Sequence, residues 1–172
     1  LFITLRDPVL NLRLVLSYTI FSNRPVITRS AKFINDSEED YQIENAMSTS
    51  IDLASDQFEL LQLNGAWARE THLEVNRLAT GIQAVSSTQG ASSHVHNPFI
   101  ALKRPETTEH TGDVYGFSLV YSGNFLGQVE VDSYGVSRVM MGINPFRFSW
   151  KLAPNQSFQT PEAVMVFSEN GL

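Results

Sequence analysis

The sequence predicts an all-β fold, an antiparallel β-sandwich, and three observations lead to this class. Short runs rich in Val, Ile, Phe, Tyr and Thr recur along the chain and are separated by turn residues. Several runs alternate apolar and polar side chains, which is typical of strands with one buried face. Apolar residues at helical spacing are nearly missing. We therefore expect one domain of packed antiparallel strands.

The first half of the chain divides into six candidate strands. They span residues 9–20, 26–35, 41–53, 58–63, 66–77 and 82–87. The sequences between them, such as Ser22-Asn23-Arg24-Pro25 and Asn64-Gly65, are rich in residues that turns favour. One face of the first run carries Leu12, Leu14, Leu16, Tyr18 and Ile20, and we expect that face to be buried. The one helical candidate, residues 48–61, fits a 3.6-residue period poorly and is interpreted as strands.

The second half of the chain yields six more candidate strands. They span residues 99–102, 114–122, 127–133, 136–141, 146–152 and 158–168. Tyr134-Gly135 and Ala153-Pro154-Asn155 mark turns between them. Residues 86–98 and 103–112 lack strand character, and loops of this length tend to carry function or to pack on another part of the protein. The alternative is that they are simply mobile.

The composition argues against several classes of partner and location. A net charge of −6, without any cluster of Lys and Arg, predicts no nucleic-acid partner. No stretch approaches 18 consecutive apolar residues and no signal-peptide pattern is present, so we expect a soluble chain without a membrane partner. Cysteine is absent, which fits a reducing compartment, and the cytoplasm is the expected location.

The length and the two ends of the sequence suggest an excised domain. A chain of 172 residues has the size of a single domain. It opens at Leu1 without Met and stops at Leu172 shortly after a predicted strand. We therefore expect residues 1–172 to be one partial domain of a longer protein.

No catalytic residue is predicted from the sequence. It contains no G-x-S-x-G, H-E-x-x-H, Walker or G-x-G-x-x-G motif. A glycosidase needs two carboxyl groups about 5 to 10 Å apart, one of them held protonated. The acidic cluster in the turn after residue 35 comprises Asp36, Glu38, Glu39 and Asp40. Its expected role is solvated charge. The acidic residues within candidate strands include Glu70, Glu74, Glu130 and Asp132, and no spacing pairs any two of them.

The candidate binding residues are His94, His96 and Asn97, which we predict to make contacts from an ordered loop. On a strand, the imidazoles of His94 and His96 would face the same way and could share a metal ion. No third ligand stands in a fixed relation to them, and Asn97-Pro98 indicates a turn, so we predict no metal and no cofactor. Contact with a sugar or with a neighbouring domain is the remaining alternative for these imidazoles.

Four aromatic residues have two possible roles. Trp67, Trp150, Tyr115 and Tyr121 could form a platform on which sugar rings stack. Each lies within a candidate strand, where aromatic side chains usually fill the core of a sandwich. The core is therefore the predicted place for all four.

Five longer strings resemble the N-terminal domain of family 36 α-galactosidases. They are L-N-G-A-W-A-R-E (63–70), G-A-S-S-H-V-H-N-P-F-I-A-L (90–102), V-Y-G-F-S-L-V-Y-S-G-N-F (114–125), G-I-N-P-F-R-F-S-W-K-L (142–152) and F-Q-T-P-E-A-V-M-V-F-S-E-N-G-L (158–172). The resemblance follows the chain in order over nearly its whole length.

The resemblance implies a β-supersandwich of the galactose mutarotase type that precedes a catalytic (β/α)₈ barrel. The parent would be a retaining α-galactosidase, often a tetramer, that acts on sugars such as melibiose and raffinose. Family enzymes carry their nucleophile in a K-W-D type motif of the barrel. In this chain Lys32, Lys103 and Lys151 are followed by Phe, Arg and Leu, so no catalytic role is carried over. The expected partners are the barrel of the same protein and, through the parent, an α-galactoside.

Two classes of function therefore remain open at the level of the sequence. In the first, the chain is a non-catalytic segment of an α-galactosidase that packs on the barrel and supports subunit assembly. In the second, it is a free-standing carbohydrate-binding β-sandwich module, a class of protein whose architecture looks the same when it is inferred from sequence.

Overall fold

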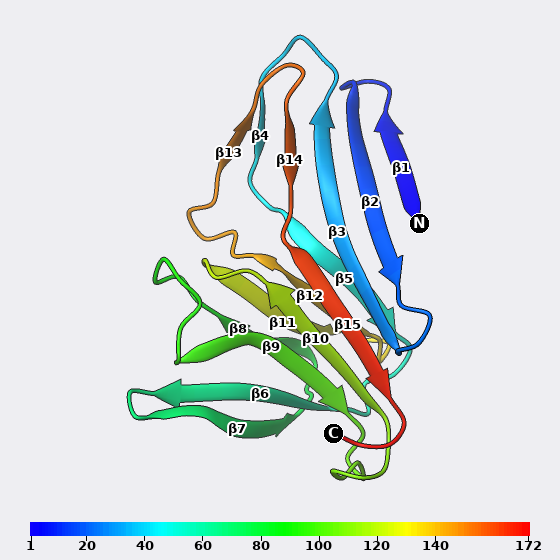
Figure 1. Cartoon of the computed structure of the whole chain (residues 1–172), viewed down its shortest axis with the longest axis vertical. Coiled ribbons are helices and arrows are strands. Elements are labelled where there is room, and N and C mark those ends of the chain that lie inside the picture. The colour runs from blue at the N-terminus through cyan, green and yellow to red at the C-terminus, as the bar shows by residue number, and fades with distance from the viewer.

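The computed structural model describes all 172 residues as strands and connecting loops, without a helix (Figure 1). The strands are β1 (Phe2–Asp7), β2 (Leu12–Ile20), β3 (Val26–Asn35), β4 (Tyr41–Ile43), β5 (Met47–Leu53), β6 (Glu59–Ala66), β7 (Arg69–Arg77), β8 (Gly81–Ser86), β9 (His96–Lys103), β10 (Val114–Val120), β11 (Phe125–Val131), β12 (Ser137–Ile143), β13 (Trp150–Leu152), β14 (Ser157–Gln159) and β15 (Glu162–Ser168). No helix long and apolar enough to cross a membrane is found. The predicted all-β class is confirmed.

The strands form two main sheets and one small one. A nine-stranded sheet has the order β1-β2-β3-β15-β10-β9-β6-β7, with β14 paired to the other end of β3. A four-stranded sheet has the order β5-β12-β11-β8, and β13 pairs with β4. Every pairing between named strands is antiparallel. The result is a sandwich whose two layers differ in width.

The hydrophobic core lies between the four-stranded sheet and the middle of the nine-stranded one. Its thirteen buried residues are Phe58, Leu60, Val85, Ile100, Leu102, Phe117, Leu119, Phe125, Val129, Val139, Met141, Ala163 and Met165. They alternate along their strands, as the period of two requires for a single buried face. Burying one large side chain such as Phe125 completely stabilises the fold by about 1.5–3 kcal/mol. This core fixes how β6 and β9, which carry the candidate site, lie against the second sheet.

The predicted strands differ from the observed ones mainly at their ends. Residues 26–35 form β3 with the predicted bounds, whereas residues 41–53 divide into β4 and β5. Residues 158–168 divide at Pro161 into β14 and β15, which pair with successive parts of β3. Proline lacks the N–H that a continuous ladder needs, which accounts for the break. β1 was not among the predicted strands.

The core location predicted for the four aromatic residues is wrong for three of them. Trp67 is 87% exposed, Trp150 is 47% exposed and Tyr121 is 37% exposed. Trp67 occupies the turn between β6 and β7 rather than a strand, so no sheet face covers it. Tyr115 packs beside the core, with its ring edge-on to Phe58 at 5.8 Å.

The turn predicted at Asn97-Pro98 is also wrong, because both residues lie within β9. The pairing of β9 with β6 shifts register here, so that Asn64 lies opposite His96 and Gln62 opposite Ile100. A register shift of this kind accommodates Pro98 within β9. The ladder is already irregular at this point, so it does not require the N–H group that proline lacks.

Candidate functional site at the β6–β7 hairpin

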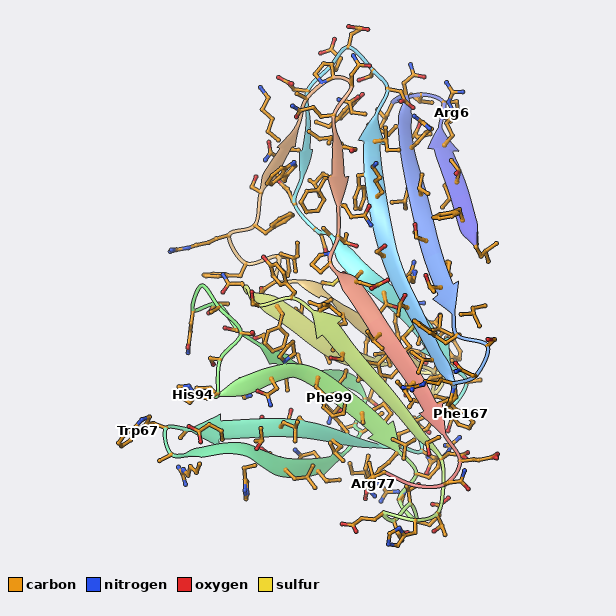
Figure 2. The ribbon with its side chains drawn as sticks, in the orientation of Figure 1. Arg6, Trp67, Arg77, His94, Phe99 and Phe167 are labelled. Atoms are coloured by element: carbon orange, nitrogen blue, oxygen red, sulfur yellow. The ribbon has the colours of Figure 1, made fainter.

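The hairpin of β6 and β7 projects from the edge of the nine-stranded sheet and carries an uncovered tryptophan at its tip. A two-residue turn, Trp67-Ala68, joins the strands, and Ala68 has a positive φ of 63°. Figure 2 shows the Trp67 side chain pointing away from the body of the molecule, near His94. An exposed indole on a strained tight turn is a costly surface feature, which makes the tip a candidate contact site.

The segment before β9 docks on this hairpin through the backbone of Gly65. The Gly65 N–H donates to the carbonyl oxygen of Val95 at 3.0 Å. A Cβ at position 65 would lie 2.4 Å from the His94 carbonyl oxygen, closer than any real contact. Glycine is therefore required for the approach, and it holds the segment with His94 beside the hairpin.

A row of polar side chains continues from His96 across the hairpin. The Nδ1 of His96 lies 2.8 Å from Oδ1 of Asn64, and the Nδ2 of Asn64 donates to a carboxylate oxygen of Glu74. The other carboxylate oxygen of Glu74 accepts from Nδ2 of Asn76 at 3.0 Å. These bonds, that of Asn76 foremost, hold the pKa of Glu74 below its ordinary value. Glu74 is thus kept ionised and orients the Asn64 amide.

A hollow of about 300 Å³ opens beside this row. It is lined by Asn64, Gly65, Arg69 and His72, without a hydrophobic side chain. An amide, a guanidinium and an imidazole supply donors and acceptors for hydroxyl groups, and the indole of Trp67 lies along the same hairpin. Chemically, the arrangement suits recognition of a polar ligand or of a protein surface.

The structure brings only part of the predicted site together. His96 belongs to the polar row, whereas His94 is exposed and reaches the hairpin through its backbone carbonyl. Asn97 is half-buried and makes no side-chain hydrogen bond. His94 and His96 lie in different local conformations, since only His96 is in the strand. No group of three or more His, Cys, Asp or Glu side chains is arranged to hold a metal ion.

The hairpin residues Asn64, Arg69, His72 and Glu74 were missed as site residues. The sequence predicts Arg69, His72 and Glu74 in the strand of residues 66–77 and Asn64 in a turn, but their convergence depends on the pairing of β6 with β7 and on a bulge at Gly65. Neither feature follows from spacing along one strand.

The shifted carboxyl groups all have lowered pKa values. The pKa of Asp36 is lowered by its hydrogen bonds from Arg13, and that of Asp52 by those from Arg138. A general acid in a glycosidase needs the opposite shift, because it must stay protonated near neutral pH. Asp36, Asp52 and Glu74 are therefore suited to structural ion pairs and hydrogen bonds.

Comparison with known proteins places the chain in a family. Residues 1–153 match the glycosyl hydrolase family 36 N-terminal domain. The α-galactosidase AgaA of Geobacillus stearothermophilus is 52% identical over 170 residues, which are 99% of this chain and 23% of that protein. The α-galactosidase Mel36A of Lactobacillus acidophilus is 45% identical over 172 residues, which are 100% of this chain and 24% of that protein.

Solved structures agree with this assignment. The crystal structure of AgaA superposes with a TM-score of 0.98 at 51% identity, over 99% of this chain and 24% of that chain. A galactose mutarotase related enzyme from Lactobacillus acidophilus matches with a TM-score of 0.54 at 5% identity, over 98% of this chain and 67% of that chain. The latter likeness concerns the fold alone and agrees with the predicted mutarotase type of sandwich.

The chain thus spans about a quarter of the length of the curated relatives that it matches. The aligned regions cover 99% and 100% of this chain, respectively. The chain belongs to the family of glycosyl hydrolase family 36 N-terminal domains.

Proposed function

We propose that residues 1–172 are the non-catalytic N-terminal sandwich segment of an α-galactosidase. The complete protein would release terminal α-galactosyl groups from sugars of the melibiose and raffinose type with retention of configuration. The observation that carries this proposal is 52% identity over 99% of the chain to an α-galactosidase of which it covers only 23%. Variants of AgaA crystallised with raffinose and with stachyose support the substrate class.

The proposal assigns catalysis to the part of the protein outside residues 1–172. Retaining hydrolysis needs a nucleophilic carboxylate and an acid/base carboxyl group about 5–5.5 Å apart. The lowered pKa values of Asp36, Asp52 and Glu74 support a structural role for these three carboxyl groups. A sandwich still influences the reaction by positioning the barrel, since misplacing a catalytic group by about 1 Å costs about a hundredfold in rate.

The role proposed for the segment is to pack on the barrel and to support assembly, as a homotetramer, in the cytoplasm. The projecting Trp67 supports a role in contacts, because an indole that is 87% exposed favours burial against a partner. The net charge of −6 fits a protein without nucleic-acid or membrane partners, and the absence of cysteine fits a reducing compartment.

A second candidate function is carbohydrate binding at the hairpin itself, which is what a free-standing module would do. The observation that favours it is the uncovered Trp67 beside a hollow lined by Asn64, Arg69 and His72. Aromatic faces and hydrogen-bonding side chains are the two elements of sugar recognition. In this case the segment with His94, His96 and Asn97 forms one wall of the binding site.

Enzyme assays test the main proposal. The complete protein should hydrolyse nitrophenyl α-galactoside and raffinose but not nitrophenyl β-galactoside, whereas the 172-residue chain should hydrolyse none of them. Failure of the complete protein to act on any α-galactoside would contradict the proposed function.

Titration with galactose and raffinose tests the second candidate. Sugar binding at the hairpin should change the tryptophan fluorescence of the complete protein in which a barrel carboxylate has been inactivated, and Trp67→Ala should abolish that change. Trp150→Phe is the matched control, because Trp150 lies at the other end of the molecule in β13 (Figure 1). An unchanged response in Trp67→Ala would rule the hairpin out.

A further inference from the structure

The segment that follows β15, residues 169–172, is held by the loop between β9 and β10, and we call it the exit segment. The two lie side by side at the lower end of the molecule (Figure 1). The Gly171 N–H donates to the carbonyl oxygen of Gly112 at 3.0 Å, and the Leu172 N–H donates to that of Thr108 at 3.2 Å. The exit segment is therefore fixed by backbone hydrogen bonds to a part of the chain that is distant in sequence.

The exit segment admits no side chain at Gly171. This residue is buried, and its φ of 88° lies in the left-handed region. A Cβ here would lie 2.5 Å from the carbonyl oxygen of Thr108 and 2.6 Å from the backbone nitrogen of His110. These are backbone atoms, so no change of rotamer relieves the clash. Glycine is thus required both by the backbone conformation and by the close approach of the loop.

The loop itself, residues 104–113, is closed tightly on its own residues, and we call it the clamp loop. Gly112 has a φ of 98°, and a Cβ at this position would lie 2.6 Å from Oγ1 of Thr107. Thr107 is buried, and its hydroxyl donates to the carbonyl oxygen of Asp113 at 3.1 Å. The clamp loop therefore presents a fixed backbone to the exit segment.

The base of the clamp loop is attached to the body of the sandwich by two cations. The Nζ of Lys103 lies 2.6 Å from a carboxylate oxygen of Glu59 and 3.4 Å from the carbonyl oxygen of Thr107, to which it donates. The guanidinium of Arg104 lies 4.0 Å from the centre of the Phe58 ring, which belongs to the core. Lys103 is buried, so losing its partner would leave an unpaired charge in the interior. The exit segment is thus connected through the clamp loop to the core.

We propose that the clamp loop sets the direction in which the polypeptide leaves the sandwich, and that Gly171 thereby positions the catalytic part of the complete protein. This inference rests on the proposed function, in which the catalytic part of the enzyme follows an N-terminal domain. Parts of a protein that are joined by a mobile connection move relative to each other. Hydrogen bonds up to Leu172 remove that freedom at the point of exit. The precision matters, because misplacing a catalytic group by about 1 Å costs about a hundredfold in rate.

Gly171→Ala in the complete protein tests the clamp, with Gly90→Ala as the matched control. Gly90 has nearly the same φ, 90°, but nothing lies within 4 Å of a Cβ built there. Both variants therefore carry the same backbone strain, and only Gly171→Ala adds a clash. Amide hydrogen exchange in the clamp loop and the exit segment should become at least about tenfold faster in Gly171→Ala alone. Exchange in β11 should be unchanged in both variants, which shows that the core stays folded.

Activity measurements connect the clamp to the reaction. The kcat for nitrophenyl α-galactoside should fall about tenfold or more in Gly171→Ala and stay within about twofold in Gly90→Ala. A Gly171→Ala protein with unchanged exchange, or with faster exchange and an unchanged kcat, would overturn the proposal. A complete protein that hydrolyses no α-galactoside would instead refute the proposed function.

A flexible insertion separates positioning from a general loss of stability. Gly-Ser inserted directly after Leu172 uncouples the exit segment from whatever follows it. The insertion should lower kcat by about as much as Gly171→Ala, and the two changes together should lower it no further, because they remove the same constraint. Effects that multiply would show that Gly171 acts on folding alone, and would overturn the positioning role.

Thr107 gives a second test that does not touch the exit segment. Thr107→Val removes the hydroxyl that closes the clamp loop, whereas Thr107→Ser keeps it. Exchange in the clamp loop should become about fivefold faster in Thr107→Val, with a lower kcat, and Thr107→Ser should restore both. If Thr107→Val shows either unchanged exchange or full activity, the clamp does not position the catalytic part.

Discussion

At the scale of single residues, Gly65 is the position on which the candidate site depends most. Its N–H holds Val95, and its missing Cβ leaves room for the His94 carbonyl. The contact is between backbone atoms, so no change of side-chain rotamer can relieve a clash there. Glycine is needed at position 65 because a Cβ would clash with the neighbouring backbone. Backbone conformation does not require it, since the φ of Gly65 lies outside the left-handed region.

We predict that Gly65→Ala detaches the segment before β9 from the hairpin. The overpacking should cost about 1–3 kcal/mol, which would speed amide hydrogen exchange in residues 92–97 about 5- to 150-fold. Gly116→Ala is the control, because the nearest atom to its Cβ would be Phe99 Cε2 at 3.9 Å. Hydrogen exchange of the complete protein, read by mass spectrometry, measures both variants, and unchanged exchange in Gly65→Ala would contradict the steric argument.

The paired histidines give the second prediction at this scale. His96 uses its Nδ1 in a contact with Asn64, and His94 lies outside the strand, so the two imidazoles are not arranged as a pair of ligands. We expect metal analysis of protein purified without a histidine tag to find less than about 0.1 zinc per chain. Stoichiometric zinc that disappears in His94→Ala would refute this.

At the scale of elements, β5 and β12 are joined on their outer side by an ion pair that should respond to pH. Arg138 donates to both carboxylate oxygens of Asp52, at 2.7 and 2.9 Å. These hydrogen bonds lower the pKa of Asp52 in the folded state. The pair therefore contributes stability at pH values above the unfolded-state pKa, and this contribution is lost as the pH falls through the folded-state pKa.

We predict that Asp52→Asn lowers the melting temperature at pH 7 by at most about 3 °C, because both side chains are half exposed and screened by solvent. The difference from the unmodified protein should vanish in solutions well below pH 4, where Asp52 is protonated in both states. Thermal unfolding across this pH range measures it. A difference in melting temperature that stays constant down to pH 2 would show that the charge of Asp52 does not cause the destabilisation.

Much of the strand arrangement could be predicted from the sequence, because alternation along one strand reports its own buried face. The run of Leu12, Leu14 and Leu16 was predicted to share a face, and it does, although residues 1–172 cover it only in part. The same alternation in Ile3 and Leu5 would have revealed β1.

What could not be predicted depends on pairing between strands. The polar row from His96 to Glu74 requires the register of three strands and two irregularities, at Gly65 and near Pro98. Trp67 was assigned to the core because aromatic residues favour strands, whereas a turn of two residues placed it outside every sheet face. In both cases the pairing of the strands and the position of the turn decide where the side chains lie, and the preferences of single residues do not predict either.

At the scale of the whole molecule, the sandwich is complete in its centre and open at one side. The central core is buried between two sheets, whereas β1 and β2 extend beyond the second sheet and the hairpin of β6 and β7 extends beyond it on the other side (Figure 1). A segment with a buried central core and two projecting pairs of edge strands is suited to contact other parts of a larger protein. This shape agrees with the proposal of a structural segment in an α-galactosidase.

The measurement that tests the central claim most directly is the rate of nitrophenyl α-galactoside hydrolysis by the complete protein and by carboxylate variants within residues 1–172. We predict turnover by the complete protein and rates within about threefold of it for Glu70→Gln, Glu74→Gln, Glu130→Gln and Asp132→Asn, because the proposed function assigns catalysis to the part of the protein outside residues 1–172. An inactive complete protein, or a loss of about a hundredfold or more in one correctly folded variant, would contradict the claim.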